Sequence, residues 1–315
     1  MKNTFKKSAL LTLLFTCLSS YGQKYILDSD TGNEIDDLYA IVYAIAEPDM
    51  ELISLNSAHF NNVQMVIDSS WSGNKVSNFV TVQESQKLNE ELLKTMDRLD
   101  IPHPMGCKNH IGYAWGYYKG ATIPESPATD FIISEAKKAS PDNKLKVICI
   151  GASTNLAAAI QKDSTITKNI HAFLLGARFD KETNVWNKSE FNIQRDLNAF
   201  DVLLNEPDLE LTVMPITTAR PYTFNKDRTL KKLSTYKATA TDKLAERWTY
   251  MNAGDERVMW DLALVVAIQK PELATLETRP APPENKRKSL KVYTQIEVEK
   301  MHKEFWDTLD AYFSK

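Results

Sequence analysis

The pattern of apolar and polar positions along the chain predicts alternating strands and helices. Short apolar runs that end in polar, loop-like residues occupy 24–30, 50–58, 144–154, 170–177 and 209–217. Helical patterns follow the first and third of these runs, at 36–48 and 155–163. In the first helical pattern one face is apolar, with residues at i, i+3, i+4 and i+7: Leu38, Ile41, Val42 and Ile45. This alternation predicts an α/β fold, a single domain whose open, mostly parallel central sheet is flanked by helices.

The chain between the second and third apolar runs is less regular. Residues 83–100 carry an amphipathic pattern that predicts a helix. Residues 107–127 are aromatic and punctuated by glycine and proline, which predicts a long loop. Such a loop forms either a wall of a substrate site or a packed surface segment, and the sequence leaves both open. The basic run 285–292 is typical of a solvated surface.

Composition narrows the classes of molecule that the protein is expected to bind. The chain has 315 residues, of which 43% are hydrophobic and 25% charged, as in ordinary soluble globular proteins. The net charge of −3 gives no electrostatic argument for binding nucleic acid. Beyond the N-terminal segment, no stretch is apolar enough to span a membrane. The partner we expect is therefore a small molecule.

The N-terminus predicts export. A basic start, MKNTFKK, precedes an apolar run of signal-peptide length and then small residues at Ser20 and Gly22. We therefore expect residues 1–22 to be a signal peptide, 23–315 to form the mature domain, and the protein to be periplasmic. The alternative is a lipid anchor on Cys17, although Phe15 and Thr16 make a poor lipidation motif.

The other two cysteines do not indicate a metal site. Cys149 lies in an apolar run and reads as a small core residue, whereas Cys107 lies in the predicted loop. A disulfide between them after export is compatible with the sequence, but the spacing does not require it.

Four aspartates gather around the first predicted turn. Asp28 and Asp30 end the first predicted strand, and Asp36 and Asp37 begin the helix that follows. Carboxylates in the first turn of a helix gain from the helix dipole, so capping alone explains the second pair. Acids that converge from both sides of one turn need a cation or shared protons. Calcium prefers several oxygen ligands of this kind.

Three distant stretches supply candidate partners for these acids. The stretch GASTNLA, 151–157, ends a predicted strand, and Asp261 opens an apolar helical pattern. The stretch NVWNKSEFNIQRD, 184–196, concentrates amide and carboxylate groups just after another strand. Such groups suit a ligand with several hydroxyls. Ligands of parallel α/β sheets bind at the carboxyl ends of the strands, where all of these stretches lie.

These four stretches, in this order, resemble the inosine–uridine-preferring nucleoside hydrolase family. The resemblance runs from about residue 24 to 270. It implies an open α/β fold and hydrolysis of the N-glycosidic bond of ribonucleosides to ribose and free base, as in purine salvage. It also implies one bound Ca²⁺, a small-molecule ribonucleoside as substrate, and assembly into a homodimer or homotetramer.

The resemblance also assigns roles to residues. It implies that calcium is held by carboxylates and one backbone oxygen, at Asp30, Asp37, Asp261 and the carbonyl of Thr154. Asp30 would act as general base on a calcium-bound water, and Asp28 would lie behind the ligands. The implied substrate contacts are Asp36 and Asn192 to the ribose hydroxyls, Asn184 and Glu190 to the 5′-hydroxyl, and Asn61 and Trp260.

The sequence departs from the family pattern at two informative places. Five residues, TGNEI, separate Asp30 from Asp36 where the common motif has three, so Glu34 competes with Asp36 for the site. Trp260 stands where many members have a histidine that protonates the leaving base. A tryptophan there resembles the purine-preferring branch, in which the indole stacks on the base, and the aromatic loop residues Trp115, Tyr117 and Tyr118 agree with this. A buried structural tryptophan is the alternative, with His59, His103 or His110 as substitute acids.

Two other functions compete with nucleoside hydrolysis. On the same fold, the chain would bind a ribosyl ligand without turnover or hydrolyse another N-riboside. In a different class, ILDSDTG reads as a strand ending in the Asp-x-Asp motif of haloacid-dehalogenase-like phosphatases. That family needs threonine or valine where this chain has Gly32, and it explains neither EFN nor TNLA.

Overall fold

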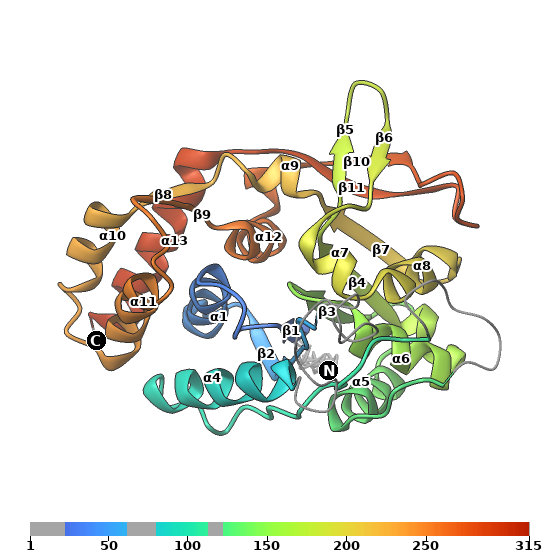
Figure 1. Cartoon of the computed structure of the whole chain (residues 1–315), viewed down its shortest axis with the longest axis horizontal. Helices are drawn as coiled ribbons and strands as arrows, with labels where there is room; N and C mark the ends of the chain where they lie inside the picture. Colours follow the sequence, from blue (N-terminus) through green and yellow to red (C-terminus); the bar gives the residue numbers. More distant parts are fainter. Residues whose placement is uncertain (1–22, 62–79, 113–121, 315) are drawn as a thin grey trace, which may run out of the picture.

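A seven-stranded sheet runs through the centre of the computed structural model (Figure 1). The structure describes residues 23–61, 80–112 and 122–314. The expected signal peptide, the lipidation alternative at Cys17 and the aromatic residues Trp115, Tyr117 and Tyr118 lie outside these ranges. In spatial order the strands are β10 (Ala274–Pro280), β11 (Ser289–Ile296), β7 (Glu210–Met214), β4 (Ile170–Leu175), β3 (Leu145–Cys149), β1 (Lys24–Ser29) and β2 (Glu51–Ser57). Only β10 runs antiparallel to its neighbour.

Helices cover both faces of this sheet. One face carries α1 (Asp36–Ala46), α9 (Ile216–Ala219), α11 (Thr239–Tyr250), α12 (Trp260–Gln269) and α13 (Val298–Phe313). The other carries α5 (Pro127–Lys138), α6 (Thr154–Lys162) and α8 (Leu197–Asn205). The remaining helices are α4 (Thr81–Thr95), α7 (Phe191–Arg195) and α10 (Lys226–Leu233), with short 3-10 turns η2 (Ser164–Asn169) and η3 (Pro271–Leu273). The predicted fold class is confirmed.

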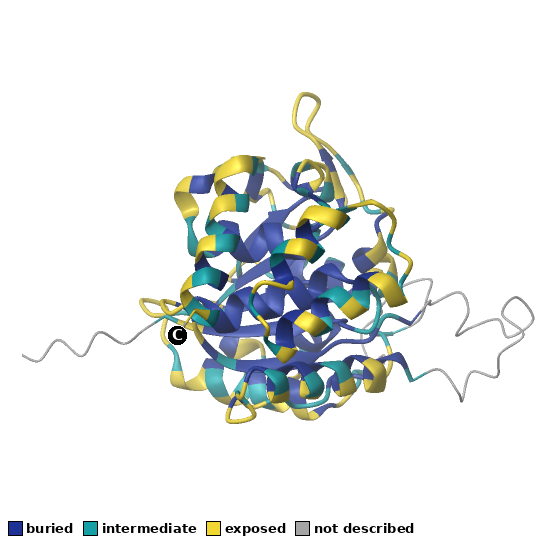
Figure 2. Cartoon of the chain, turned by 90° about the vertical axis from the view of Figure 1, so that its left-hand side faces the viewer, coloured by how far each residue is buried: buried dark blue, intermediate teal, exposed yellow. Residues whose placement is uncertain are grey.

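The sheet separates two hydrophobic cores. Successive side chains of a strand point to opposite faces, so Tyr25 and Leu27 pack into one core and Ile26 into the other. Figure 2 shows the buried strands and inner helix faces enclosed by exposed outer helix faces. Helices α1 and α12 pack against each other, and every residue of α1 is buried. This explains why their sequences are apolar almost all round.

Several elements went unpredicted because their signals are short or depend on pairing. Two small antiparallel pairs consist of three-residue strands: the hairpin of β5 (Arg178–Asp180) with β6 (Val185–Asn187), and β8 (Thr223–Asn225) with β9 (Glu256–Val258), which α10 and α11 separate in sequence. The prediction that 285–292 is only a solvated surface is wrong for its second half. Leu290 and Val292 are buried in β11, because alternate residues of that strand face the core.

The described part of the chain decides whether the two cysteines are paired. Cys107 and Cys149 are both free and buried, so they form no disulfide. The Cys107 thiol lies 3.4 Å from the hydroxyls of Ser126 and Thr129, which fits a small polar contact in the core. Within residues 23–61, 80–112 and 122–314, none of the helices is both long and apolar enough to cross a bilayer.

Candidate active site

A cavity of about 230 Å³ opens at the carboxyl ends of the parallel strands. This is where ligands bind in open α/β sheets, because the strand ends and the helix starts leave polar groups there. Seven of the residues predicted for the site line it: Asp30, Asp36, Asp37, Glu190, Asn192, Trp260 and Asp261. They come from three separate stretches of the chain, and the fold brings them into one pocket.

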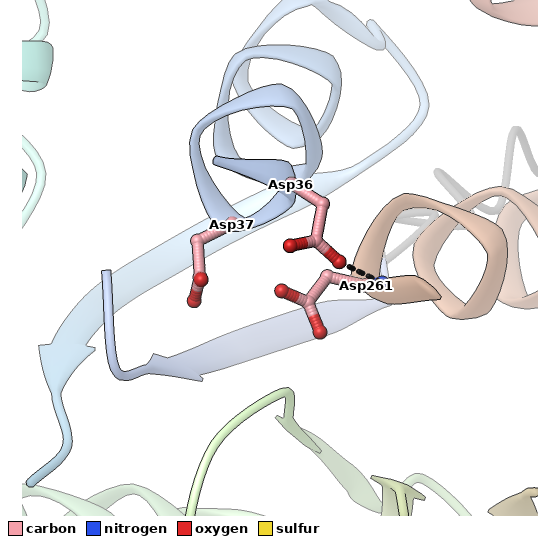
Figure 3. Close-up of side chains that lie close together, drawn as sticks. All are labelled: Asp36, Asp37 and Asp261. Carbon is pink, nitrogen blue, oxygen red and sulfur yellow. Dashed lines mark hydrogen bonds between the residues drawn. The ribbon is translucent and has the colours of Figure 1, made fainter. Parts of the chain in front are cut away.

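Three carboxylates converge at one side of the pocket (Figure 3). Asp36 and Asp37 begin α1 and Asp261 lies in the first turn of α12, and one oxygen of each lies within 4.8 Å of the others. The backbone N–H of Asp261 donates to Asp36 Oδ2 at 3.1 Å, which joins the two helix starts. Asp37 Oδ1 accepts a hydrogen bond of 2.7 Å from the Ser29 hydroxyl.

Asp30 lies at the end of β1, beside the three converging carboxylates. Its side chain packs on Gly151, where an added Cβ would lie 2.7 Å from Asp30 Oδ1. The other oxygen, Oδ2, is buried and has no hydrogen-bond partner in the described part of the chain. A buried carboxylate oxygen without a partner is unusual in proteins and indicates a site for a ligand.

Burial and mutual repulsion raise the pKa values of this group. Burial is the largest cause for each. It raises the pKa of Asp36 to about 6 and, with repulsion from Asp36, the pKa of Asp37 to about 7. The pKa values of Asp30 and Asp261 lie well above the ordinary value, through burial and the neighbouring carboxylates. Four acids held this way favour a cation, because a cation stabilises their charged forms.

The donor set fits a hard divalent metal ion. All of the side-chain ligand atoms on offer are carboxylate oxygens, and at least one of them, Asp30 Oδ2, is orphaned. Oxygen-only ligation is what calcium and magnesium prefer, and softer metals favour nitrogen or sulfur. The pocket therefore suits a metal ion as well as a polar ligand.

Two arginines hold the long turn between Asp30 and Asp36. Arg247 donates to the carbonyl oxygens of Gly32 at 2.8 Å and Glu34 at 3.0 Å. The carboxylate of Glu34 forms an ion pair with Arg257. The turn is thus fixed from α11 and β9, and Asp36, rather than Glu34, lies in the carboxylate group.

Glu190 and Asn192 form the opposite wall. The Glu190 carboxylate caps α7 by accepting from the backbone N–H groups of Asn192 and Ile193, each at 3.2 Å. The Asn192 amide nitrogen donates to the carbonyl oxygens of Ile150 at 2.9 Å and Leu175 at 3.3 Å, at the ends of β3 and β4. Both side chains are therefore held rigidly at the pocket.

Three predicted residues do not line this pocket. Asn184 is exposed in the β5–β6 turn, with φ of 58°, and its Oδ1 accepts from Arg279 at 3.3 Å. Asn61 is buried. Its amide nitrogen donates to the Lys108 carbonyl and its amide oxygen accepts from the Thr81 hydroxyl, each at 2.6 Å.

Thr154 is the third residue that lies away from the pocket. It begins α6, so its carbonyl points along the helix axis, and its hydroxyl donates to Asp196 at 2.7 Å. The residue of this segment that lines the pocket is Ile150, at the end of β3.

Trp260 is partly exposed and lines the pocket, which argues against a buried structural tryptophan. The guanidinium of Arg257 lies 5.4 Å from the centre of its ring. The histidines named as substitute acids lie elsewhere. His59 is fully buried, and burial lowers its pKa to about 3. His103 binds the Ile101 carbonyl at 2.8 Å, and burial lowers the pKa of His110.

Further lining residues went unpredicted. They are Asn33, Ile150, Leu175, Arg178, Phe191 and Ile216. The positions of Ile150 and Leu175 at strand ends and of Phe191 within EFN were usable signals. Ile216, just after the end of β7, carried the same signal, whereas Arg178 reaches the pocket from the unpredicted strand β5.

The fold and the pocket together define an α/β protein with an acidic, metal-competent site at the carboxyl edge of its sheet. The chain belongs to the inosine-uridine preferring nucleoside hydrolase family, whose model matches residues 25–304. The family resemblance predicted from the four motifs is therefore confirmed. It excludes the alternative of a haloacid-dehalogenase-like phosphatase.

Two curated plant proteins are similar over part of their length. The chain is 29% identical over 189 residues to the probable uridine nucleosidase 2 of Arabidopsis thaliana, covering 58% of this chain and 55% of that protein. It is 28% identical over 201 residues to uridine nucleosidase 1 of the same plant, covering 62% and 57%. The matched region thus spans little more than half the length of these relatives.

Solved structures support the fold. The plant nucleoside hydrolase PpNRh1 superposes with a TM-score of 0.66 at 18% identity, covering 92% of this chain and 99% of that one. A purine-preferring ribonucleoside hydrolase from Gardnerella vaginalis gives 0.65 at 20% identity with the same coverage. At such identities the likeness establishes the shared fold alone.

Proposed function

We propose that this protein is a calcium-dependent nucleoside N-ribohydrolase, which cleaves the N-glycosidic bond of ribonucleosides to ribose and free base. The observation that carries the proposal is one pocket that combines four buried carboxylates, the polar side chains of Glu190 and Asn192, and an aromatic wall at Trp260. Family membership supports the reaction class. The acidic group supports a metal ion, and its all-oxygen chemistry favours calcium.

Asp30, Asp37 and Asp261 would hold the ion, with Asp36 beside them. The backbone oxygen expected from Thr154 is better supplied by Ile150, since Ile150 is the residue of that segment at the pocket. When bound, calcium would orient the 2′- and 3′-hydroxyls of the ribose and lower the pKa of the attacking water.

The chain's own residues would carry out the remaining steps. Asp30, through its unpartnered Oδ2, accepts a proton from the water as that water attacks C1′. The bond between C1′ and the base nitrogen breaks through an oxocarbenium-like transition state. Glu190 and Asn192 hold the ribose hydroxyls, which fixes C1′ above Asp30. The exposed face of Trp260 stacks on the base.

Incubating the purified protein with a panel of purine and pyrimidine nucleosides tests this proposal. We expect calcium-dependent release of ribose from at least one nucleoside, and loss of that release in Asp30→Asn. Inosine compared with uridine tests purine preference, which Trp260 supports and the plant uridine nucleosidases do not. If calcium binds but no nucleoside releases ribose, the proposal is wrong.

A second candidate is a ribosyl-binding protein without turnover, or a hydrolase of another N-riboside. Two observations favour it. Trp260 has no titrating group that could protonate a leaving base, and Asn184 lies away from the pocket. Tight binding of a ribose analogue without ribose release from nucleosides would support it.

We also propose export to the periplasm, on the sequence of residues 1–22. Cell fractionation with mass spectrometry of the mature N-terminus tests this. A mature chain starting near Gln23 is expected, and a lipid-modified Cys17 would support the anchored alternative.

A further inference from the structure

Glu34 places a carboxylate oxygen without a partner at the wall of the pocket. It belongs to the long turn between β1 and α1, and both Asn33 and Glu34 line the cavity. The Oε1 atom of Glu34 forms the ion pair with Arg257, whereas Oε2 is buried and has no hydrogen-bond partner among residues 23–61, 80–112 and 122–314. Because buried polar atoms are normally paired, this oxygen needs a partner from outside the described chain.

The geometry of the ion pair explains why this oxygen is left over. An arginine and a carboxylate often form a fork of two parallel hydrogen bonds. Here the contact runs from Nη2 of Arg257 to Oε1 of Glu34, and the buried Nε of Arg257 also lacks a partner in the described part of the chain. The carboxylate is therefore turned so that only one of its oxygens faces the guanidinium. Since Glu34 lines the cavity, Oε2 is available to a molecule bound there.

Arg257 also connects Glu34 to the aromatic wall of the pocket. Its guanidinium lies 5.4 Å from the centre of the Trp260 ring. Arg257 itself does not line the cavity, so it leaves the cavity side of that ring to a ligand, whereas Glu34 and Trp260 both line the cavity. In the proposed function the base stacks on Trp260. A flat ring stacked there presents its edge to the side chains that lie beside the tryptophan, and Glu34 is one of them.

The chemistry of a carboxylate determines which base edges it can bind. An ionised carboxylate accepts hydrogen bonds and donates none. Hypoxanthine, guanine and uracil carry a ring N–H group on the edge away from the ribose, and adenine and cytosine carry an amino group there. Unsubstituted purine, as its riboside, carries neither. A site built around a buried acceptor strongly disfavours a ligand that lacks the matching N–H group.

We propose that Glu34 is a specificity-determining residue, whose Oε2 accepts a hydrogen bond from an N–H group on the edge of the nucleobase that stacks on Trp260. This inference rests on the proposed function. Arg247 donates to the carbonyl oxygens of Gly32 and Glu34 and thereby holds the turn, so the acceptor is in place before the substrate binds. The N–H group of the base takes no part in the bond that breaks, so Glu34 acts on substrate binding.

The substitution Glu34→Gln reverses the polarity of this contact while it keeps the size of the side chain. Arginine only donates, so Arg257 retains the amide oxygen as its partner, and the amide NH₂ group takes the place of Oε2. Two donors then face each other wherever the base presents an N–H group. A base with a bare ring nitrogen at that position gains a donor instead.

Kinetics on matched nucleosides test the inference. Inosine and adenosine each carry an N–H group on the base edge, and purine riboside carries none. In Glu34→Gln we expect kcat/KM for inosine, adenosine or both to fall about 10- to 100-fold, mainly through KM, while that for purine riboside does not fall. If the wild type acts only on pyrimidine nucleosides, uridine and 3-methyluridine form the same comparison. Equal losses with and without the N–H group, or no loss for any substrate, would overturn the role of Glu34.

A matched control and a second variant keep the test decisive. Glu256→Gln makes the same chemical change at an exposed residue of β9, next to Arg257 in the sequence, and should change no rate. Glu34→Asp keeps the charge but withdraws the carboxylate by one methylene. It is expected to show the same selective loss, and it replaces Glu34→Gln if that variant folds poorly. A loss that is equal for all substrates in Glu34→Asp would show that Glu34 only supports the turn.

The wild-type protein separates the two levels of the argument. If the wild type releases ribose from none of these nucleosides, the proposed function fails, and the role of Glu34 fails with it. If the wild type is active but Glu34→Gln does not distinguish bases with an N–H group from bases without one, only the role of Glu34 fails.

Discussion

The backbone N–H of Asp261 donates to Asp36 Oδ2 at 3.1 Å, across 225 residues of sequence. This hydrogen bond joins the first turn of α12 to the first turn of α1. In addition to the hydroxyl contact proposed for it, Asp36 therefore fixes the backbone that carries the Asp261 carboxylate.

Replacing Asp36 tests this positioning role. Asp36→Ala removes the acceptor for the Asp261 N–H and is expected to weaken calcium binding by about 10- to 100-fold. Asp36→Asn keeps an acceptor oxygen and should weaken it less, so the pair separates the hydrogen bond from the charge. Isothermal titration calorimetry measures both. Unchanged calcium affinity in Asp36→Ala would contradict the role.

The raised pKa values predict an unusual pH dependence of stability in the metal-free protein. Asp36 and Asp37 have pKa values of about 6 and 7 when folded, against an ordinary 3.8. Between about pH 4 and 7 the folded state holds protons that the unfolded state has released. This contribution to the free energy of unfolding is therefore present at low pH and is lost as pH rises through that window.

Thermal unfolding with a chelator and with calcium checks this sign. We expect the Tm of the chelated protein to fall between pH 5 and pH 8. Calcium should raise Tm more at pH 8 than at pH 5, because at pH 5 it must displace protons from its ligands. A calcium effect that is larger at pH 5 would show that these carboxylates are not the binding site.

Gly151 is predicted to be intolerant of even one added carbon. In Gly151→Ala the new Cβ would lie 2.7 Å from Asp30 Oδ1, closer than real contacts allow. Because Asp30 must move, we expect ribose release to fall by more than about tenfold, as small misplacements of reacting groups cost this much. Ala152→Gly, at the neighbouring buried position, is the matched control for backbone effects. Full activity in Gly151→Ala would show that Asp30 is not the general base.

Arg247 is expected to stabilise the long turn. Arg247→Met leaves the carbonyl oxygens of Gly32 and Glu34 without their donor. We expect a loss of about 1–3 kcal/mol in the free energy of unfolding by urea, together with weaker calcium binding. Arg228→Met, a surface arginine, should change neither. A turn that keeps its calcium affinity without Arg247 would show that other contacts suffice to hold it.

The site was predictable where a local pattern coincides with a strand end. Asp30, Asp36, Asp37 and Asp261 flank apolar runs, and strand ends of a parallel sheet meet at one edge, so their convergence follows from sequence. The same rule fails for Thr154. That residue begins α6, after the short loop that follows β3, so Ile150, directly after the strand, lines the pocket instead.

Sequence patterns could not predict the contacts that form only through tertiary structure. Nothing near Arg247 or Arg257 in the sequence indicates that they hold a turn more than 200 residues away. Asn184 matched by spacing alone, yet the β5–β6 hairpin carries it outward (Figure 1). The antiparallel edge formed by β10 and β11 escaped prediction because β10 buries none of its residues and charged residues interrupt the apolar positions of both strands.

The most direct test of the central claim is ribose release from a nucleoside panel after calcium is removed and restored. The proposal predicts that chelation abolishes release and that added calcium restores it in proportion to occupancy measured by calorimetry. Absence of ribose release from every nucleoside at saturating calcium, or release that persists unchanged after complete chelation, would contradict it.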